Sequence, residues 1–289
     1  MEKIKLTVIT GPTASGKSAL AERIALELGG EIVSCDSMQI YRGLDIGTAK
    51  PTKEEQERVP YHMIDIVDME SEFSCADYVE GANKAILDIW QRGKMPILCG
   101  GTGLYVENIL YPTDFSTAGA DEGYRESLEV YTNRELYLML QEIDPVSAAA
   151  NHENNRKRVA RALEIYHLTG IPKSEWDLRS RTKESPYEVR HISLVSSNRE
   201  YLYGRINKRV DIMMESGLLE EAKSIDFEKC PTASQAIGYK ELRGYLEGSV
   251  SLDEAVENLK RSTRNYAKRQ LTWFSRYKSA EFIDISKND

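Results

Sequence analysis

The sequence predicts an α/β protein in which a parallel sheet with flanking helices is interrupted by a helical insertion. Residues 4–9 alternate and are rich in β-branched side chains, as in a buried strand. A glycine-rich stretch at 11–18 follows, and apolar residues then recur every four positions until the glycine pair 29–30 ends the helix. This strand and helix rhythm lapses between about residues 111 and 190 and then returns. The economical explanation is one sheet domain that carries an insertion.

The glycine-rich stretch matches the phosphate-binding pattern G-x-x-x-x-G-K-[S/T] at every fixed position. It consists of Gly11, Pro12, Thr13, Ala14, Ser15, Gly16, Lys17 and Ser18. The glycines let backbone N–H groups close around phosphate oxygens, and the following helix adds its partial positive charge. Lys17 supplies a full positive charge, and Ser18 would hold a Mg²⁺ ion that bridges the same oxygens. The sequence therefore predicts a P-loop NTPase-like fold that binds a polyphosphate, while a glycine-rich turn without a ligand is the weaker alternative.

A second expected strand, 31–35, runs directly into Asp36. Ligands of open α/β sheets lie outside the carboxyl ends of the strands, so Asp36 is expected to face the substrate beside the phosphate loop. A carboxylate at this place suits a general base. The alternative is that Asp36 caps the next helix.

Residues 61–68 are a candidate strand and 95–99 a further strand. Between them, 73–92 are expected to form a helix with Tyr78, Ala82, Ile86 and Ile89 on one face. That last strand ends in Gly-Gly-Thr, where many phosphate-loop kinases and ATPases would show an acidic residue. The glycines permit the close approach of a ligand, and the hydroxyl of Thr102 could contact a phosphate or a base. A plain tight turn is the alternative.

We predict that residues 1–112 and 188–289 form the sheet domain and that 113–187 form the helical insertion. Within the insertion, Arg158 and Arg161 share a helical face, which is compatible with a solvated face or with a phosphate contact.

The last third of the chain is expected to be helical. Arg205 and Arg209 are four residues apart on one helix, where they could clamp a pyrophosphate or pair with nearby acids. The final helix, 259–278, carries seven cations and no acid, interleaved with aromatic residues, in a chain of net charge −8. Cations that follow a backbone, with aromatic rings available for stacking, are typical of RNA-binding surfaces.

The composition narrows the class of protein. The 289 residues contain no apolar run long enough to cross a membrane, and the first strand begins too early to leave room for a signal peptide, so we expect a cytosolic protein without a membrane partner. Neither the four cysteines nor the four histidines show metal-binding or disulfide-framework spacing.

These segments together resemble the tRNA dimethylallyltransferases, also called tRNA isopentenyltransferases, along nearly the whole chain. The similar segments are 11–18, 36–42, 47–51, 100–105, 144–145, 158–164, 235–241 and 269–274. The phosphate loop is shared by many families, whereas the pair of Asp-Ser-Met-Gln at 36–39 and Gly-Thr-Gly-Leu-Tyr at 101–105 is far more specific.

The resemblance implies transfer of a dimethylallyl group from dimethylallyl diphosphate to the exocyclic amine of the adenosine just 3′ of the anticodon. It implies that Asp36 is the base on that amine and that Thr102 and Arg205 help to hold the diphosphate. It also implies a tRNA-binding set, which comprises Asp36, Ser37, Met38, Gln39, Thr102, Arg125, Lys157, Arg158, Val159, Ala160, Arg161, Ala236, Ile237, Gly238, Tyr239, Lys240 and Glu241. The expected enzyme is bacterial in type, monomeric, dependent on Mg²⁺ and without the zinc-finger extension of eukaryotic relatives. Its RNA partner is the anticodon stem-loop.

Two other classes of protein fit parts of the pattern. A phosphate loop followed by an aspartate after the second strand also describes a small-metabolite kinase, and a non-catalytic RNA-binding nucleotide switch is a third possibility. The basic, aromatic final helix argues against the kinase, and Asp36 beside the phosphate loop argues against a pure binding protein.

Overall fold

The computed structural model describes residues 2–112, 119–181, 184–230 and 232–287. The chain forms two compact units, of which one comprises residues 1–109 with 186–289 and the other residues 110–185. The sequence placed these boundaries two or three residues later. Strand β5 (Tyr187–Val195) shows why, because Tyr187 already pairs with Ile4 of the first strand.

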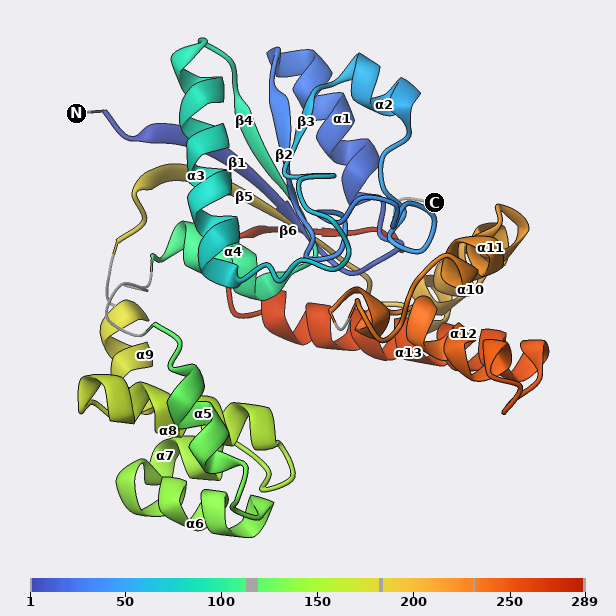
Figure 1. Ribbon diagram of the computed structural model, residues 1–289. Helices are drawn as coiled ribbons and strands as arrows, with labels where there is room; N and C mark the ends of the chain where they lie inside the picture. The colour runs from blue at the N-terminus through green and yellow to red at the C-terminus, as the bar shows by residue number, and fades with distance from the viewer. Residues whose placement is uncertain (1, 113–118, 182–183, 231, 288–289) are drawn as a thin grey trace. The chain divides into compact units, whose positions relative to one another are not determined.

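The first unit is built on a parallel sheet, which confirms the predicted α/β class (Figure 1). The order of its strands is β3-β2-β4-β1-β5-β6. The strands besides β5 are β1 (Ile4–Thr10), β2 (Glu31–Cys35), β3 (Tyr61–His62), β4 (Pro96–Gly100) and β6 (Glu281–Asp284). Since the strands are parallel, the segments that follow β1, β2 and β4 all leave the sheet at the same edge.

Helices cover both faces of the sheet because its strands are apolar on both sides. Helix α1 (Lys17–Leu28) packs Ala21 and Ile24 against one face. Helix α3 (Cys75–Gln91) contacts β2 and β4, and Figure 1 shows it on the other side of the sheet. Its buried residues are those that the sequence pattern placed on one face: Tyr78, Ala82, Ile86 and Ile89.

The remaining helices of this unit come mainly from the end of the chain. They are α2 (Lys53–Arg58), α4 (Gly103–Leu110), α10 (Arg199–Glu215), α11 (Leu218–Lys223), α12 (Tyr239–Leu246), α13 (Leu252–Phe274) and the short 3₁₀ helix Ala233–Gln235. Helix α13 packs against α10 and α12, and a second apolar core forms there around Val210, Leu218 and Tyr239.

The second unit is a helical bundle, as the sequence predicts. Its helices are α5 (Glu122–Leu128), α6 (Asn133–Ile143), α7 (Pro145–Ala149), α8 (Arg156–Thr169) and α9 (Lys173–Arg181). Leu136 and Leu140 of α6 pack against Val159 and Leu163 of α8 to form its core.

Two predicted elements differ from those observed. The third strand covers only residues 61–62 of the expected 61–68, because Met63 and Asp65 adopt left-handed φ angles of 62° and 52° that turn the chain out of the sheet. The final helix begins at Leu252, seven positions before the expected start, because Ser251 caps it by accepting a hydrogen bond from the N–H of Glu254 (3.2 Å). Its first turns are acidic, so the basic run begins only at Lys260, and it continues past Phe274, where the helix ends four residues before the expected 278.

Candidate active site

The phosphate loop joins β1 to α1 at the carboxyl edge of the sheet. Gly11, Ala14 and Gly16 adopt positive φ angles of 145°, 62° and 92°. A Cβ at Gly11 would lie 2.7 Å from the carbonyl oxygen of Leu194, so only glycine fits at this position. No side chain caps the start of α1. The backbone N–H groups of the loop and the helix terminus are therefore arranged to receive an anion.

Lys17 is held at the base of this loop. Its Nζ donates to the carbonyl oxygen of Pro12 (2.7 Å). The pKa of Lys17 is lowered to about 8, mainly by burial and also by the nearby Arg209, while Cys99 and Asp36 act in the opposite direction. A bound diphosphate would place negative charge beside this buried ammonium group and stabilise it.

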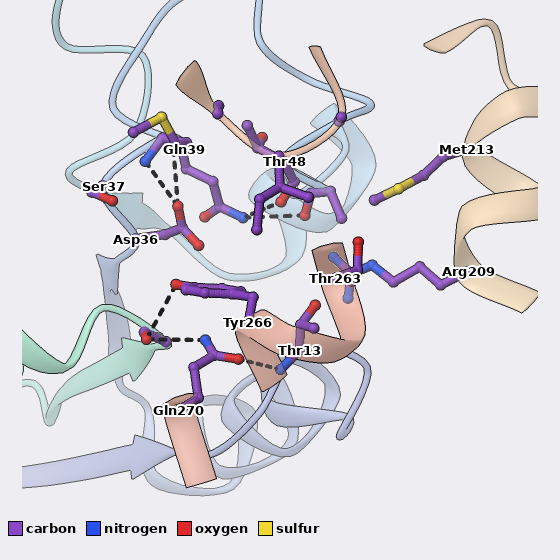
Figure 2. A pocket seen from close by; sticks show the side chains of 18 of the residues that line it. Thr13, Asp36, Ser37, Gln39, Thr48, Arg209, Met213, Thr263, Tyr266 and Gln270 are labelled. Atoms are coloured by element: carbon purple, nitrogen blue, oxygen red, sulfur yellow. Dashed lines mark hydrogen bonds between the residues drawn. The ribbon is translucent and has the colours of Figure 1, made fainter. Parts of the chain in front are cut away.

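Asp36 stands at the end of β2, and its two carboxylate oxygens have different surroundings. Oδ1 accepts hydrogen bonds from the backbone N–H groups of Met38 (2.8 Å) and Gln39 (3.4 Å). Oδ2 finds no hydrogen-bond donor in the part of the chain that the structure describes, and Figure 2 shows it directed towards the cavity. Oδ1 thus caps backbone N–H groups, as the capping alternative expects, but those of a turn and not of a helix. Oδ2 stays available for a substrate.

One cavity of about 320 Å³ contains both Asp36 and the phosphate loop. Its lining includes Lys17, Ser18, Arg209, Asp36 and Tyr266. Figure 2 shows Asp36 and Arg209 on opposite sides of it. Other parts of its wall come from residues 37–39, 47–49, 235–238 and 263–270. A second cavity of about 390 Å³ opens on the outer side of the phosphate loop and shares Lys17, Ser18 and Arg209 with the first.

The two arginines of α10 occupy different positions. Arg205 donates through Nε to the carbonyl oxygen of Ala14 in the phosphate loop (2.8 Å), and it lines only the outer cavity. Arg209 lines both cavities. Burial lowers the pKa of Arg209 and Asp36 opposes that shift. The i, i+4 spacing offered both arginines as a pyrophosphate clamp, whereas the family resemblance named only Arg205 for the diphosphate.

Thr102 forms hydrogen bonds with Ser37, in the turn that follows Asp36. Its hydroxyl accepts a hydrogen bond from the N–H of Ser37 (3.0 Å) and donates to Ser37 Oγ (3.4 Å). Thr102 thereby fixes the segment that carries Asp36. Its contact with a diphosphate or with RNA stays a prediction.

Gln270 of α13 is a residue to which sequence reasoning gave no role. Its Oε1 accepts from the N–H of Thr13 in the phosphate loop (2.8 Å), and its Nε2 donates to the carbonyl oxygen of Gly101 (3.0 Å). A Cβ at Gly101 would clash with Nε2, which explains the glycine at this position. Gln270 thus holds the two ligand-facing loops together.

The predicted RNA-binding segments of this unit meet at the cavity, but with different exposure. Ser37, Met38, Gln39, Ile237 and Lys240 line it, together with Ala236 and Gly238. The amide of Gln39 is fully engaged, because Oε1 accepts from Ser34 Oγ (2.8 Å) and Nε2 donates to the carbonyl oxygens of Thr48 and Ala49 (3.1 and 3.2 Å).

Two further members of that set are structural in their contacts. Tyr239 is buried and donates to Glu221 (2.7 Å), a carboxylate that also accepts the backbone N–H groups of residues 45–47. Glu241 accepts the N–H of Gly238 at the start of α12 (2.9 Å). Glu221, which the sequence gave no reason to select, therefore joins two walls of the cavity.

Part of the basic face of α13 is engaged within the protein. Lys260 pairs with Asp211 (2.8 Å), and Arg264 donates to Asn207 (2.7 Å). Arg269 lies over the ring of Tyr266 (5.6 Å) and lines the cavity. Arg276, which lies beyond the end of the helix, stacks on Trp273 (4.7 Å).

In the helical unit, the predicted RNA-binding set divides in three. Lys157 and Arg158 are exposed on α8, and Ala160 is half-buried beside them. Val159 is fully buried in the core of the unit, so its side chain offers no surface to RNA. Arg125 and Arg161 both pair with Glu164, at 2.9 and 2.7 Å.

Comparison with known proteins places this site in a family. The IPP transferase family model matches residues 39–277. A protein from Anoxybacillus flavithermus named tRNA dimethylallyltransferase is 47% identical, over 98% of this chain and 91% of that protein. The chain belongs to the IPP transferase family. It is therefore a transferase, and the predicted resemblance is confirmed.

Solved structures of other IPP transferases share the fold. A tRNA isopentenylpyrophosphate transferase from Bacillus halodurans is 46% identical with a TM-score of 0.73, over 98% of this chain and 90% of that one. A eukaryotic dimethylallyltransferase acting on tRNA is 32% identical with a TM-score of 0.83, over 98% of this chain and 74% of that one. Among the described helices of the present chain, none combines the length and the apolar character needed to cross a bilayer.

Proposed function

We propose that the protein transfers a dimethylallyl group from dimethylallyl diphosphate to the exocyclic N6 amine of the adenosine 3′-adjacent to the anticodon of tRNA, with release of diphosphate. The observation that carries this proposal is the single cavity in which Asp36 faces a phosphate loop with Lys17 and Arg209. Relatives named for this reaction support it. We also propose that the enzyme is cytosolic and acts as a monomer on the anticodon stem-loop.

The diphosphate is expected to bind on the phosphate-loop side. An allylic C–O bond breaks readily once the negative charge that develops on its leaving oxygen is neutralised. Lys17, Arg209 and the loop N–H groups provide this neutralisation, and the diphosphate departs with the electron pair of that bond. Arg205 supports the loop through Ala14 and borders the outer cavity.

The acceptor adenine is expected to enter from the side of Asp36, lifted from the anticodon stack. Its exocyclic amine is a poor nucleophile because the lone pair is delocalised into the ring. As the new N–C bond forms, the amine proton moves to Oδ2 of Asp36, the oxygen without a donor in the described structure. Thr102 keeps Asp36 in place through Ser37.

Mg²⁺ is the expected cofactor, and the residues at the loop fit it. The hydroxyl of Ser18 lines both cavities and has no hydrogen-bond partner in the described structure. No cluster of three or more metal-binding side chains occurs among the described residues, so phosphate oxygens and water would supply most of the ligands. When bound there, the ion would add charge neutralisation to the leaving diphosphate.

The test uses unmodified tRNA with dimethylallyl diphosphate labelled in its carbon skeleton and, separately, with ATP labelled in its γ-phosphate. We expect the carbon label on tRNA, and none on a matched tRNA that carries guanosine in place of the acceptor adenosine. Transfer of phosphate from ATP would instead support the kinase alternative. Binding of either donor without transfer to RNA would support the nucleotide switch.

A further inference from the structure

A buried carboxylate organises the basic surface of the helical unit. Glu164 of α8 is fully buried, and donors of the protein engage both of its oxygens. Oε1 accepts a hydrogen bond from the backbone N–H of Asp121 (2.8 Å) and forms an ion pair with Arg125 Nε (2.9 Å). Oε2 accepts hydrogen bonds from Arg125 Nη2 (3.1 Å) and from Arg161 Nη1 (2.7 Å). The protein itself therefore engages both oxygens of the carboxylate.

The two arginines come from different helices but are fixed at one point. Arg125 on α5 binds both oxygens of Glu164 with its planar fork, which sets the orientation of its guanidinium group. Arg161 on α8 bridges Glu164 and the carbonyl oxygen of Gly119 (2.9 Å). Both side chains nevertheless remain open to solvent, with exposed fractions of 49% for Arg125 and 34% for Arg161.

This arrangement leaves net positive charge on the surface. Among the described residues, Arg125 and Arg161 share one anion, Glu164, and the exposed Lys157 and Arg158 lie near Arg161 on α8. A buried ion pair is weak evidence of a purely stabilising role, because apolar side chains of similar volume often stabilise a core as well. Its advantage here is geometric, since unpaired arginines on a surface would sample many rotamers.

We propose that Glu164 is a positioning residue that fixes Arg125 and Arg161 as one fork for the phosphate backbone of RNA. The proposal rests on the proposed function, because tRNA is the partner that the fork would serve. The chemistry that it recognises is a phosphodiester, to which two guanidinium groups of fixed direction donate hydrogen bonds.

Glu164→Gln distinguishes a positioning role from a purely electrostatic one, because the two predict opposite changes in tRNA affinity. Removal of a negative charge from an RNA-facing surface strengthens binding if only the summed charge matters. If Glu164 positions the fork, the same change releases the arginines, and binding to unmodified tRNA weakens by about tenfold. Steady-state kinetics should then show a raised KM for tRNA, with kcat and the KM for dimethylallyl diphosphate unchanged.

Glu153→Gln is the matched control. It also removes one carboxylate from the helical unit, where Glu153 pairs with Arg134 (3.0 Å) away from the fork. We expect its tRNA affinity to equal or slightly exceed that of the wild type. Equal or tighter binding by folded Glu164→Gln would overturn the proposal.

Arg125→Lys tests the fork without removing any charge, and it decides the question if Glu164→Gln does not fold. One ammonium group cannot occupy both oxygens of Glu164 as the guanidinium does. We expect several-fold weaker tRNA binding at an unchanged melting temperature, whereas unchanged affinity would contradict the fork. Since binding is the readout, a wild-type protein that binds tRNA but transfers no dimethylallyl group would refute the proposed function and leave this test intact.

Discussion

Asp36 and Glu164 are both carboxylates that interact electrostatically with arginine side chains, but their hydrogen bonding differs. Glu164 is fully buried, and protein donors occupy both of its oxygens. Asp36 has one oxygen engaged by two backbone N–H groups, and its other oxygen faces a cavity without a donor from the described residues. An interaction with cations is therefore common to the carboxylate that we propose to react and the one that we propose to position other residues, whereas the occupancy of their two oxygens differs.

The pKa of Glu164 fits this distinction. Burial alone would raise it, but hydrogen bonds from Arg161, the Asp121 N–H and Arg125 together hold it below the ordinary glutamate value. A carboxylate in this state is a poor acceptor for a further proton near neutral pH. Oδ2 of Asp36 has no such set of donors among the described residues. An oxygen that is to accept a proton from a substrate amine must be open in this way.

The largest expected effect follows from replacing Asp36 with Asn. The amide oxygen can still accept the N–H groups of Met38 and Gln39, so the turn should keep its shape. It cannot take up the amine proton, and single-turnover transfer from labelled dimethylallyl diphosphate to tRNA should slow by roughly two to four orders of magnitude. Donor affinity and melting temperature should change little.

The helix-cap alternative makes the opposite prediction for the same variant. Asn caps about as well as Asp, so Asp36→Asn would then be nearly silent in both rate and stability. A rate within a few-fold of the wild type would remove Asp36 from the chemistry.

A smaller effect is expected from pH, through Lys17. Its pKa of about 8 in the free protein means that the ammonium group loses its proton as the pH rises through that value, although an ordinary lysine stays charged to about 10.5. A bound diphosphate favours the charged form, so donor binding between about pH 8 and pH 10 should take up a proton. Affinity should fall by up to about tenfold for each pH unit in that range. Calorimetry in buffers of different ionisation enthalpy measures this uptake directly.

Lys17→Arg supplies the control, because arginine stays protonated throughout this range. The variant is expected to bind the donor more weakly at pH 7, but without proton uptake and without the decline above pH 8. If the decline persisted in Lys17→Arg, another group would have to carry the titration. Arg209, Cys99 and Asp36 all interact with Lys17, but burial raises the pKa of Cys99 to about 12, above the range of the decline, so a group outside this set would then be sought.

The sequence predicted those parts of the site that are encoded locally. The phosphate loop, the position of Asp36 after a strand and the apolar face of α3 each depend on a few neighbouring residues. Periodicity and motif spacing report such arrangements directly. The family resemblance added the tRNA-binding set, part of which lines the cavity.

The residues that hold the site together were not predictable in this way. Gln270 contacts Thr13 across 257 positions, and Glu221 contacts Gly47 across 174. No local pattern marks either side chain, because each is placed by the packing of helices that the sequence positions only approximately. Glu164 was hidden for a related reason, since a glutamate on a charged helix is normally solvated.

The smallest expected effect concerns Arg158, which tests whether the fork differs from the rest of its surface. Arg158 is exposed on α8, and its side chain has no charged or hydrogen-bonding partner among the described residues. Arg158→Ala should weaken tRNA binding only a few-fold and lower the slope of log affinity against log salt by about one.

Arg161→Ala also removes one charge, but it takes a hydrogen-bond donor away from Glu164 as well. Its loss of tRNA affinity should therefore exceed that of Arg158→Ala, with the same change of slope. Binding of unmodified tRNA to both variants, titrated with salt, measures the difference. Equal losses would mean that the surface acts through its summed charge, whereas a silent Arg158→Ala would identify that residue as part of a solvated face.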